Sequence, residues 1–286
     1  MIKTSKQLKD LIHNRTKGES GKSQLLFRNY AMERFLERIA LSPYNNNFIL
    51  KGGLLISSIV GLDNRATMDI DATIRNLPIE SEHMRRIIEE IMTVEIDDNM
   101  CFEIKDVSGI MDDAEYGGIR FSLDAYLDKT RIPLKIDIST GDIITPSEIT
   151  YQYKLMFEQR MISLNAYPLE TIIAEKIETI LIRTIFNTRL RDYYDLFILQ
   201  QNDTEIDIKT LAEALTATCR KRKSEQVLSD YQRILDDIEQ SLVIQNFWEC
   251  YQSKNSYAAG ITWSELMSCI RSICYKCVSH YRGITD

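Results

Sequence analysis

The stretch FILKGGLLISSIVGLDNRATMDIDATI, residues 48–74, decides the fold of this chain. Residues 48–53 have the composition of a short buried strand that ends in a glycine turn, and an apolar segment of helical length follows. Residues 68–74 alternate polar and apolar side chains, which predicts a second strand. The order strand, glycine turn, helix, strand indicates a domain that combines a β-sheet with helices.

Two carboxylates, Asp69 and Asp71, lie inside the second predicted strand. Because residues i and i+2 of a strand share one face, both acids are predicted to point to the same side, opposite Ile70 and Ala72. Two neighbouring carboxylates raise each other's pKa unless a cation lies between them. A hard divalent cation such as Mg²⁺ prefers these oxygen ligands, so the pair is a candidate metal site.

A third acid comes from PLKIDIST, residues 133–140, whose alternation predicts a strand with Lys135, Asp137 and Ser139 on one face. If this strand lies beside the strand of Asp69, then Asp137 joins the acidic pair as a third metal ligand or as a general base. Three carboxylates can hold two metal ions about 3.5–4 Å apart, an arrangement used for in-line nucleotidyl transfer.

The segment before the acids suits phosphate binding. Gly52 and Gly53 lack side chains, so a phosphate can approach the backbone, and the helix that follows offers free N–H groups at its start. Arg65 precedes the acidic strand and is a candidate partner for a triphosphate oxygen. An ordinary turn or a solvated strand face explains each feature taken alone. Their order along the chain is what indicates nucleotide chemistry.

Periodicity along the rest of the chain divides it into two parts. Helices are predicted over residues 24–41 and 78–94, and strands over residues 101–107, 118–127 and 133–140. After residue 167 the pattern is mostly helical. We therefore predict an α+β fold, in which residues 1–150 form a mixed-sheet core with helices and residues 151–286 form a helical domain.

Composition limits the partners and the compartment. The formal net charge of −7 gives no global attraction to nucleic acid, although a local basic groove is compatible with it, and no DNA partner is expected. No apolar run reaches the length of about 18 residues that a spanning helix needs. The N-terminal sequence contains no apolar signal core, so we expect a cytoplasmic protein without a membrane partner. The six cysteines are then expected to be reduced.

Residues 48–74 resemble motif I of the nucleotidyltransferase superfamily, a Gly-Gly or Gly-Ser followed by Asp-x-Asp. More narrowly, the chain is similar to the AbiEii/AbiGii family, the nucleotidyltransferase toxins of bacterial abortive-infection and toxin–antitoxin systems, to which the MenT toxins also belong. YPLETIIAEKIETIL, residues 167–181, resembles the family's Glu-x-x-x-Ala-Glu-Lys helix. NTRLRDYYDLF, residues 187–197, resembles its Arg-x-Lys-Asp-x-Tyr-Asp-Leu motif. The resemblance covers residues 20–200 and implies a nucleotidyltransferase-like core.

The resemblance implies roles for individual residues in both parts of the chain. Asp69 and Asp71 would be metal ligands, and Lys176 would bind the triphosphate. Asp192 or Asp195 would complete the site from the helical domain, with Asp192 favoured because it follows a basic residue directly. The helices that carry these residues are expected to close over the nucleotide.

Two positions depart from the family pattern, and the roles of the helical residues have alternatives. Gly53 stands where many nucleotidyltransferases carry serine. Arg191, which the resemblance implies as a nucleotide contact, stands where the family carries lysine, which keeps the charge but changes its geometry. Lys176 could simply pair with the neighbouring Glu175 and Glu178 on a solvated helix face. Asp192 and Asp195 could likewise pair with Arg189 and Arg191 at the surface.

The resemblance also implies substrates and partners. The protein would use Mg²⁺ or Mn²⁺ to transfer a nucleotide from an NTP, with the 3′ end of a tRNA as the expected acceptor and blocked translation as the result. A cognate antitoxin is expected, with or without a stable complex, and the biological role would be phage defence. The alternatives are a nucleotidyltransferase that modifies a protein or a small molecule, and a non-catalytic nucleotide-binding module.

The C-terminal segment CIRSICYKCVSHY offers Cys269, Cys274 and Cys277 at a spacing that partly suits zinc. The run also has helical periodicity, with Ile270 and Ile273 on the same pattern, and no second pair of ligands lies nearby. We therefore expect thiols packed on a helix face in preference to a zinc site.

Overall fold

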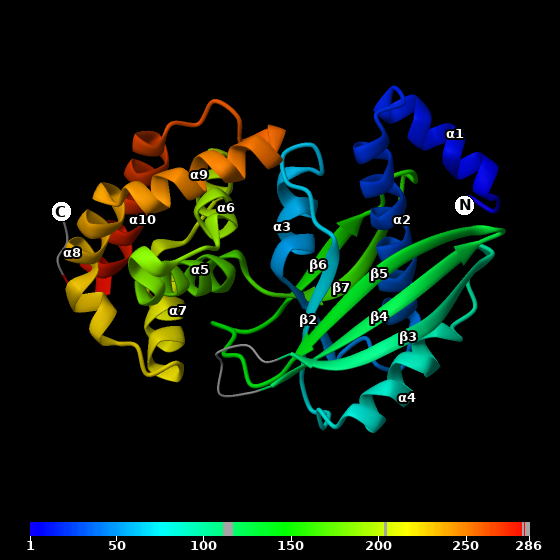
Figure 1. The fold of residues 1–286 in the computed structure, drawn as a ribbon. Coiled ribbons are helices and arrows are strands. Elements are labelled where there is room, and N and C mark those ends of the chain that lie inside the picture. The colour runs from blue at the N-terminus through cyan, green and yellow to red at the C-terminus, as the bar shows by residue number, and fades with distance from the viewer. Residues whose placement is uncertain (111–116, 203–204, 282, 284–286) are drawn as a thin grey trace. The chain divides into compact units, whose positions relative to one another are not determined.

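The computed structural model describes residues 1–110, 117–202, 205–281 and 283. The chain divides into two compact units. The sheet unit comprises Met1–Leu62, Ala66–Asp142 and Ile149–Ala166. The helical unit comprises Asp63–Arg65, Ile143–Glu148 and the chain from Tyr167 onward. Figure 1 shows the strands confined to the first unit and a set of helices in the second.

The sheet unit is built on one mixed β-sheet. Its described strands are β1 (Phe48–Lys51), β2 (Asp69–Ile74), β3 (Met100–Ile110), β4 (Gly118–Leu127), β5 (Thr130–Ser139), β6 (Ile149–Lys154) and β7 (Met161–Ala166), in the order β3-β4-β5-β2-β1-β7-β6. The pairs β1–β7 and β2–β5 are parallel, and the other neighbours are antiparallel. The predicted α+β fold with a mixed sheet is therefore confirmed.

The last two strands correct the sequence analysis, which assigned no strand beyond residue 140. In β7 the side chains of Ile162 and Leu164 are buried while Met161 and Ser163 are exposed, so the strand does alternate, but only over six residues. Its neighbour β6 gives no clearer signal, because Tyr153 alone among the β6 side chains is buried. In the sheet β7 lies between β6 and β1, and β1 has β2 on its other side.

The described helices of the sheet unit are α1 (Ser5–Thr16), α2 (Ser20–Leu41), α3 (Gly52–Val60) and α4 (Ser81–Met92). Helix α2 covers one face, where Phe35 packs edge-on against Phe102 of β3 with 5.4 Å between the ring centroids. The fully buried Ile70 and Ile136 lie opposite each other on β2 and β5 and point to that same face. The acidic side chains of β2 consequently point to the other face.

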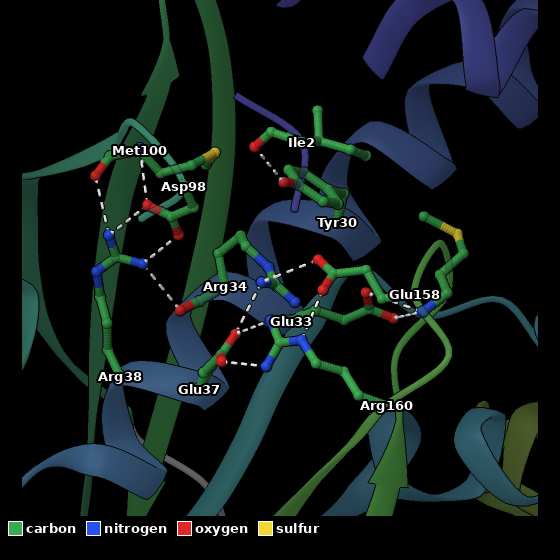
Figure 2. Close-up of polar contacts among 11 residues, drawn as sticks. Ile2, Tyr30, Glu33, Arg34, Glu37, Arg38, Asp98, Met100, Glu158 and Arg160 are labelled. Carbon is green, nitrogen blue, oxygen red and sulfur yellow. Dashed lines mark hydrogen bonds and ion pairs between the residues drawn. The ribbon is translucent and has the colours of Figure 1, made fainter. Parts of the chain in front are cut away.

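Helix α2 buries charged side chains as well as apolar ones, and Figure 2 shows how they are paired. Arg38 donates to both carboxylate oxygens of Asp98 at 2.8 and 2.9 Å, and Arg160 donates to Glu37 at 2.9 Å. These ion pairs tie α2 to the segment before β3 and to the turn between β6 and β7. Burial raises the pKa of the neighbouring Glu33 to about 8.

The helical unit confirms the helical pattern predicted after residue 167. Its described elements are α5 (Leu169–Arg183), the 3₁₀ turn η1 (Thr184–Phe186), α6 (Leu190–Gln201), α7 (Ile208–Lys221), α8 (Gln226–Gln240), α9 (Leu242–Lys254), the 3₁₀ turn η2 (Ser256–Ala258) and α10 (Trp263–Tyr281). Tyr193, Tyr194 and Trp248 are buried in its core. None of the helices among the described residues combines the length and the apolarity that a membrane crossing requires.

Two of the α10 cysteines, Cys274 and Cys277, belong to this core, and Cys269 is partly exposed. Cys274 and Cys277 are each 1 % exposed, and burial raises the pKa of the Cys277 thiol to about 12. Within the part of the chain that the structure describes, all six cysteines are free. These positions agree with a packed thiol face on a helix.

Candidate active site

A row of four charged residues crosses four adjacent strands on the face of the sheet opposite α2. Lys51 of β1 lies opposite Asp71 of β2, Asp71 lies opposite Asp137 of β5, and Asp137 lies opposite Arg120 of β4. Directly opposed residues on neighbouring strands have side chains close enough to interact. The condition that the sequence left open, that the strand of Asp137 neighbours the strand of Asp69, is therefore met.

Asp69 adds a third acid beside this row. It lies two residues before Asp71 on the same strand face and opposite Lys135 of β5. Burial and the negative charge of Asp137 raise the pKa of Asp69, and they outweigh the nearby Lys135 and Arg120. The cations around Asp69 therefore do not fully compensate the cost of ionising its buried carboxyl group.

The glycine turn is shaped around Asp71. Gly52 has a φ of +66°, and a Cβ placed on it would lie 2.6 Å from the Asp71 Cγ, so both the backbone conformation and the space require glycine. The Gly53 N–H, at the start of α3, donates to Asp71 Oδ2 at 3.1 Å. Burial nevertheless raises the pKa of Asp71, against the opposing effects of this hydrogen bond and of Lys51. The Gly53 N–H, which was expected to approach a phosphate, thus also holds the Asp71 carboxylate.

Two cations at the ends of the row were not singled out from the sequence. Lys51 Nζ pairs with Asp142 Oδ2 at 2.5 Å, and the Thr73 hydroxyl donates to the same oxygen at 3.0 Å. Arg120 binds both oxygens of Asp137 at 2.7 and 2.6 Å. Alternation in residues 118–127 places Arg120 on the polar face, but only the pairing of β4 with β5 brings it to Asp137.

The donor chemistry fits a divalent cation at Asp69 and Asp71. Their carboxylates offer hard oxygen ligands on one strand face, and their raised pKa values show that ionisation lacks full compensation. Asp137 is different because Arg120 occupies both of its oxygens. Among the described residues, no group of three Asp, Glu, His or Cys side chains converges in a metal-binding geometry. A third ligand from Asp137 would require Arg120 to move.

The predicted residues of the helical unit form a separate buried cluster. Lys176 of α5 donates to Asp192 Oδ1 at 2.6 Å and lies 2.8 Å from Asp195 Oδ2, both on α6. Arg65 contacts the two oxygens of Asp195 at 2.7 and 3.2 Å. Burial alone would raise the pKa of Asp195, but the charges of Lys176 and Arg65 lower it to about 2.

The burial of this cluster excludes the alternative in which Lys176 and Asp195 form surface pairs on a solvated helix face. The side chain of Asp195 is fully buried and that of Lys176 is 13 % exposed, so neither belongs to a solvated helix face. Glu175 and Glu178 instead pair with Arg222, at 3.4 and 2.6 Å. The structure therefore brings together Lys176, Asp192 and Asp195, as the motif resemblance implies.

The two arginines expected to contact a nucleotide have different environments. Arg65 is 2 % exposed and its guanidinium is held by Asp195, so it does not present a free cation to a triphosphate in this conformation. Arg191, on α6, is exposed.

A family model described as "Nucleotidyl transferase AbiEii toxin, Type IV TA system" matches residues 34–258. These residues include both the row of charged residues on the sheet and the Lys176 cluster. The chain belongs to this family. The resemblance found in the sequence motifs is thereby confirmed. Membership of the AbiEii family identifies the protein as a nucleotidyltransferase of the type IV toxin–antitoxin class.

Two solved structures resemble this AbiEii chain over most of its length. JHP933 from Helicobacter pylori is 17 % identical, with a TM-score of 0.50, and the match covers 91 % of this chain and 96 % of that one. A candidate nucleotidyltransferase from H. pylori is 14 % identical, with a TM-score of 0.50 and coverage of 92 % and 98 %. At these identities the likeness shows a shared fold. No curated protein sequence matches the chain significantly.

Proposed function

We propose that this AbiEii-family protein is a Mg²⁺-dependent toxin that transfers a nucleoside monophosphate from an NTP to the 3′ end of a tRNA. The observation that carries the proposal is the fit of Gly52 and Gly53 around Asp71, with Asp69 on the same face and Asp137 directly opposite. Transfer to the 3′ end would prevent aminoacylation and stop translation. The proposed role is phage defence in the cytoplasm, under the control of a cognate antitoxin.

In the proposed reaction the sheet unit provides the acids. Asp69 and Asp71 would hold Mg²⁺ or Mn²⁺, which supplies charge neutralisation for the triphosphate when bound. Asp137 would accept the proton of the attacking acceptor hydroxyl, or serve as a third ligand. Gly52 leaves room for the Asp71 carboxylate, and the phosphate is proposed to bind beside this turn, at the N-terminus of α3. Nucleotidyl transfer asks the protein chiefly for positioning and charge stabilisation, which these groups can provide.

The helical unit would provide the second set of charges. By family resemblance Lys176 binds the triphosphate, with the exposed Arg191 as a further phosphate partner. Asp192 and Asp195 hold the Lys176 ammonium group, and their negative charges raise its pKa against the effect of burial, so it stays protonated. We assign Arg65 to this scaffold, because it fixes Asp195 through two contacts.

The proposal is tested by label transfer. The purified protein is incubated with Mg²⁺ and each α-labelled NTP in turn, in parallel with total tRNA, bulk protein and an aminoglycoside. We expect label at tRNA 3′ ends, located by mass spectrometry, and none with Asp71→Asn. Label on protein or on the aminoglycoside alone would replace the tRNA acceptor by one of these substrates. NTP binding without pyrophosphate release would indicate a non-catalytic binding module.

A further inference from the structure

We propose that Arg120 is a phosphate-binding residue of the active site whose guanidinium is masked by Asp137 until a divalent cation occupies that carboxylate. The ligand is the triphosphate group of the nucleotide. The inference rests on the proposed function, because it assumes that the acidic face binds a metal ion and an NTP. It adds a residue that none of the sequence motifs contains.

The geometry makes Arg120 and a metal ion competitors for Asp137. Arg120 Nε donates to Oδ1 at 2.7 Å and its terminal nitrogen donates to Oδ2 at 2.6 Å, so both carboxylate oxygens face the guanidinium. A bidentate pair of this kind fixes the orientation of both groups. Asp137 can therefore give both of its oxygens to a cation shared with Asp71, its neighbour on β2, only when Arg120 leaves.

The exposure of the pair shows which partner can move. The side chain of Arg120 is 38 % exposed, whereas that of Asp137 is 18 % exposed. Arg120 is the more exposed partner, so its side chain can turn toward solvent while Asp137 stays in place on β5. Arg120 lies opposite Ser108 of β3, a small exposed residue that leaves space on the outer side for a long side chain to rotate.

The released guanidinium has the chemistry and the location to bind a phosphate. Arginine presents a planar fork of donors that matches phosphate oxygens in a bidentate manner. Arg120 stands in the same row as Asp71, which contacts the Gly53 N–H at the start of α3, so its charge lies on the face where the phosphates are proposed to bind. One bound metal ion would thus give that face two cations for the phosphates, the divalent ion itself and the released Arg120.

Binding measurements on the full chain test this inference without relying on activity. Binding of Mn²⁺ alone is followed by electron paramagnetic resonance. Binding of the four non-hydrolysable α,β-methylene NTP analogues is followed by calorimetry with Ca²⁺ present. The variants are Arg120→Gln, Arg120→Lys and the control Arg131→Gln. Arg131 is a matched control because it is also an exposed arginine of the same strand pair that binds an aspartate, Asp124, at 2.8 Å.

The expected signature is a pair of opposite shifts. Arg120→Gln should bind Mn²⁺ alone about tenfold more tightly, if Asp137 is paired nine-tenths of the time in the wild type. It should bind the nucleotide analogue about tenfold more weakly, because a charge-assisted bidentate contact is lost. Arg120→Lys should recover part of the nucleotide affinity, and Arg131→Gln should match the wild type in both assays.

Other outcomes overturn the inference. Equal weakening of both ligands in Arg120→Gln, with an unchanged circular dichroism spectrum, would make the pair a general support of the sheet. No change in either affinity would leave Arg120 without a role at the site. A wild-type chain that binds neither Mn²⁺ nor nucleotide would overturn the proposed function itself, and this result is distinct because it appears before any variant is compared.

Discussion

The row of charged residues in the sheet unit and the Lys176 cluster of the helical unit both combine aspartates with lysine and arginine, but the pKa values of their aspartates shift in opposite directions. On the sheet face, Asp69 and Asp71 have raised pKa values because burial and neighbouring acids outweigh the nearby cations. In the helical unit, Lys176 and Arg65 surround Asp195 and lower its pKa to about 2. The cations near Asp69 and Asp71 do not fully compensate their burial, whereas Asp195 is paired with two cations. The direction of the pKa shift therefore separates the carboxylates that are candidate metal ligands from Asp195, whose role is to hold Lys176 and Arg65.

The largest test of this comparison is Asp195→Asn. The change leaves Arg65 and Lys176 buried without the shared counter-charge, and breaking a buried pair costs about 3–5 kcal/mol of unfolding free energy. Urea unfolding monitored by tryptophan fluorescence measures it, because both tryptophans, Trp248 and Trp263, lie in the helical unit.

The control and the pH dependence of this variant follow from the same contacts. Asp192→Asn should lower the unfolding free energy by less than Asp195→Asn does. Asp192 is 14 % exposed, and of the two cations it pairs with Lys176 and not with Arg65. The stabilisation from Asp195 is fully present above its unfolded pKa of about 3.8 and is lost as the pH falls through about 2. The gap between wild type and Asp195→Asn should therefore close in strong acid. A gap that stays constant with pH would contradict the ionic explanation.

The second test is Gly52→Ala, which acts on the sheet unit through its backbone. A left-handed conformation costs an L-residue about 1–2 kcal/mol, and the new Cβ would also displace the Asp71 carboxylate. We expect a loss of stability in this range, seen by circular dichroism, together with a loss of transfer activity. Gly21→Ala is the control, because it lies in α2 with no heavy atom near its Cβ position and should gain about 0.5–1 kcal/mol. A fully active Gly52→Ala would show that the fit around Asp71 is not needed.

The smallest expected effect on stability is that of Asp71→Asn, although this variant, like Asp195→Asn, replaces a buried carboxylate by a neutral amide. An asparagine oxygen can still accept from the Gly53 N–H, and the change removes a charge that burial disfavours. The unfolding free energy at neutral pH should stay within about 0.5 kcal/mol of the wild type. Transfer activity should fall on the order of 10³-fold, because a group that stabilises the reacting charges is lost. A loss of stability as large as that of Asp195→Asn would remove the distinction between the two regions.

For the fold, the sequence was most informative where the signal is local. The order of β1, the glycine turn, α3 and β2 follows from composition within residues 48–74, and the structure places each element there. Strand β6 was missed because it lies at the edge of the sheet and Tyr153 alone among its side chains is buried, so its sequence shows no apolar face. Strand β7 was missed because it joins the sheet through β1, a strand far earlier in the chain, and periodicity does not reveal such a neighbour.

The candidate site shows the same division. The sequence by itself determined that Asp69 and Asp71 share a face, since alternation is a property of an extended backbone, and its motifs identified the AbiEii family. Tertiary structure alone decided that Arg120 pairs with Asp137 and that Arg65 pairs with Asp195, 130 residues further along the chain. The physical reason is that side-chain direction is set by local backbone geometry, whereas charge pairing depends on which distant segments fold against each other.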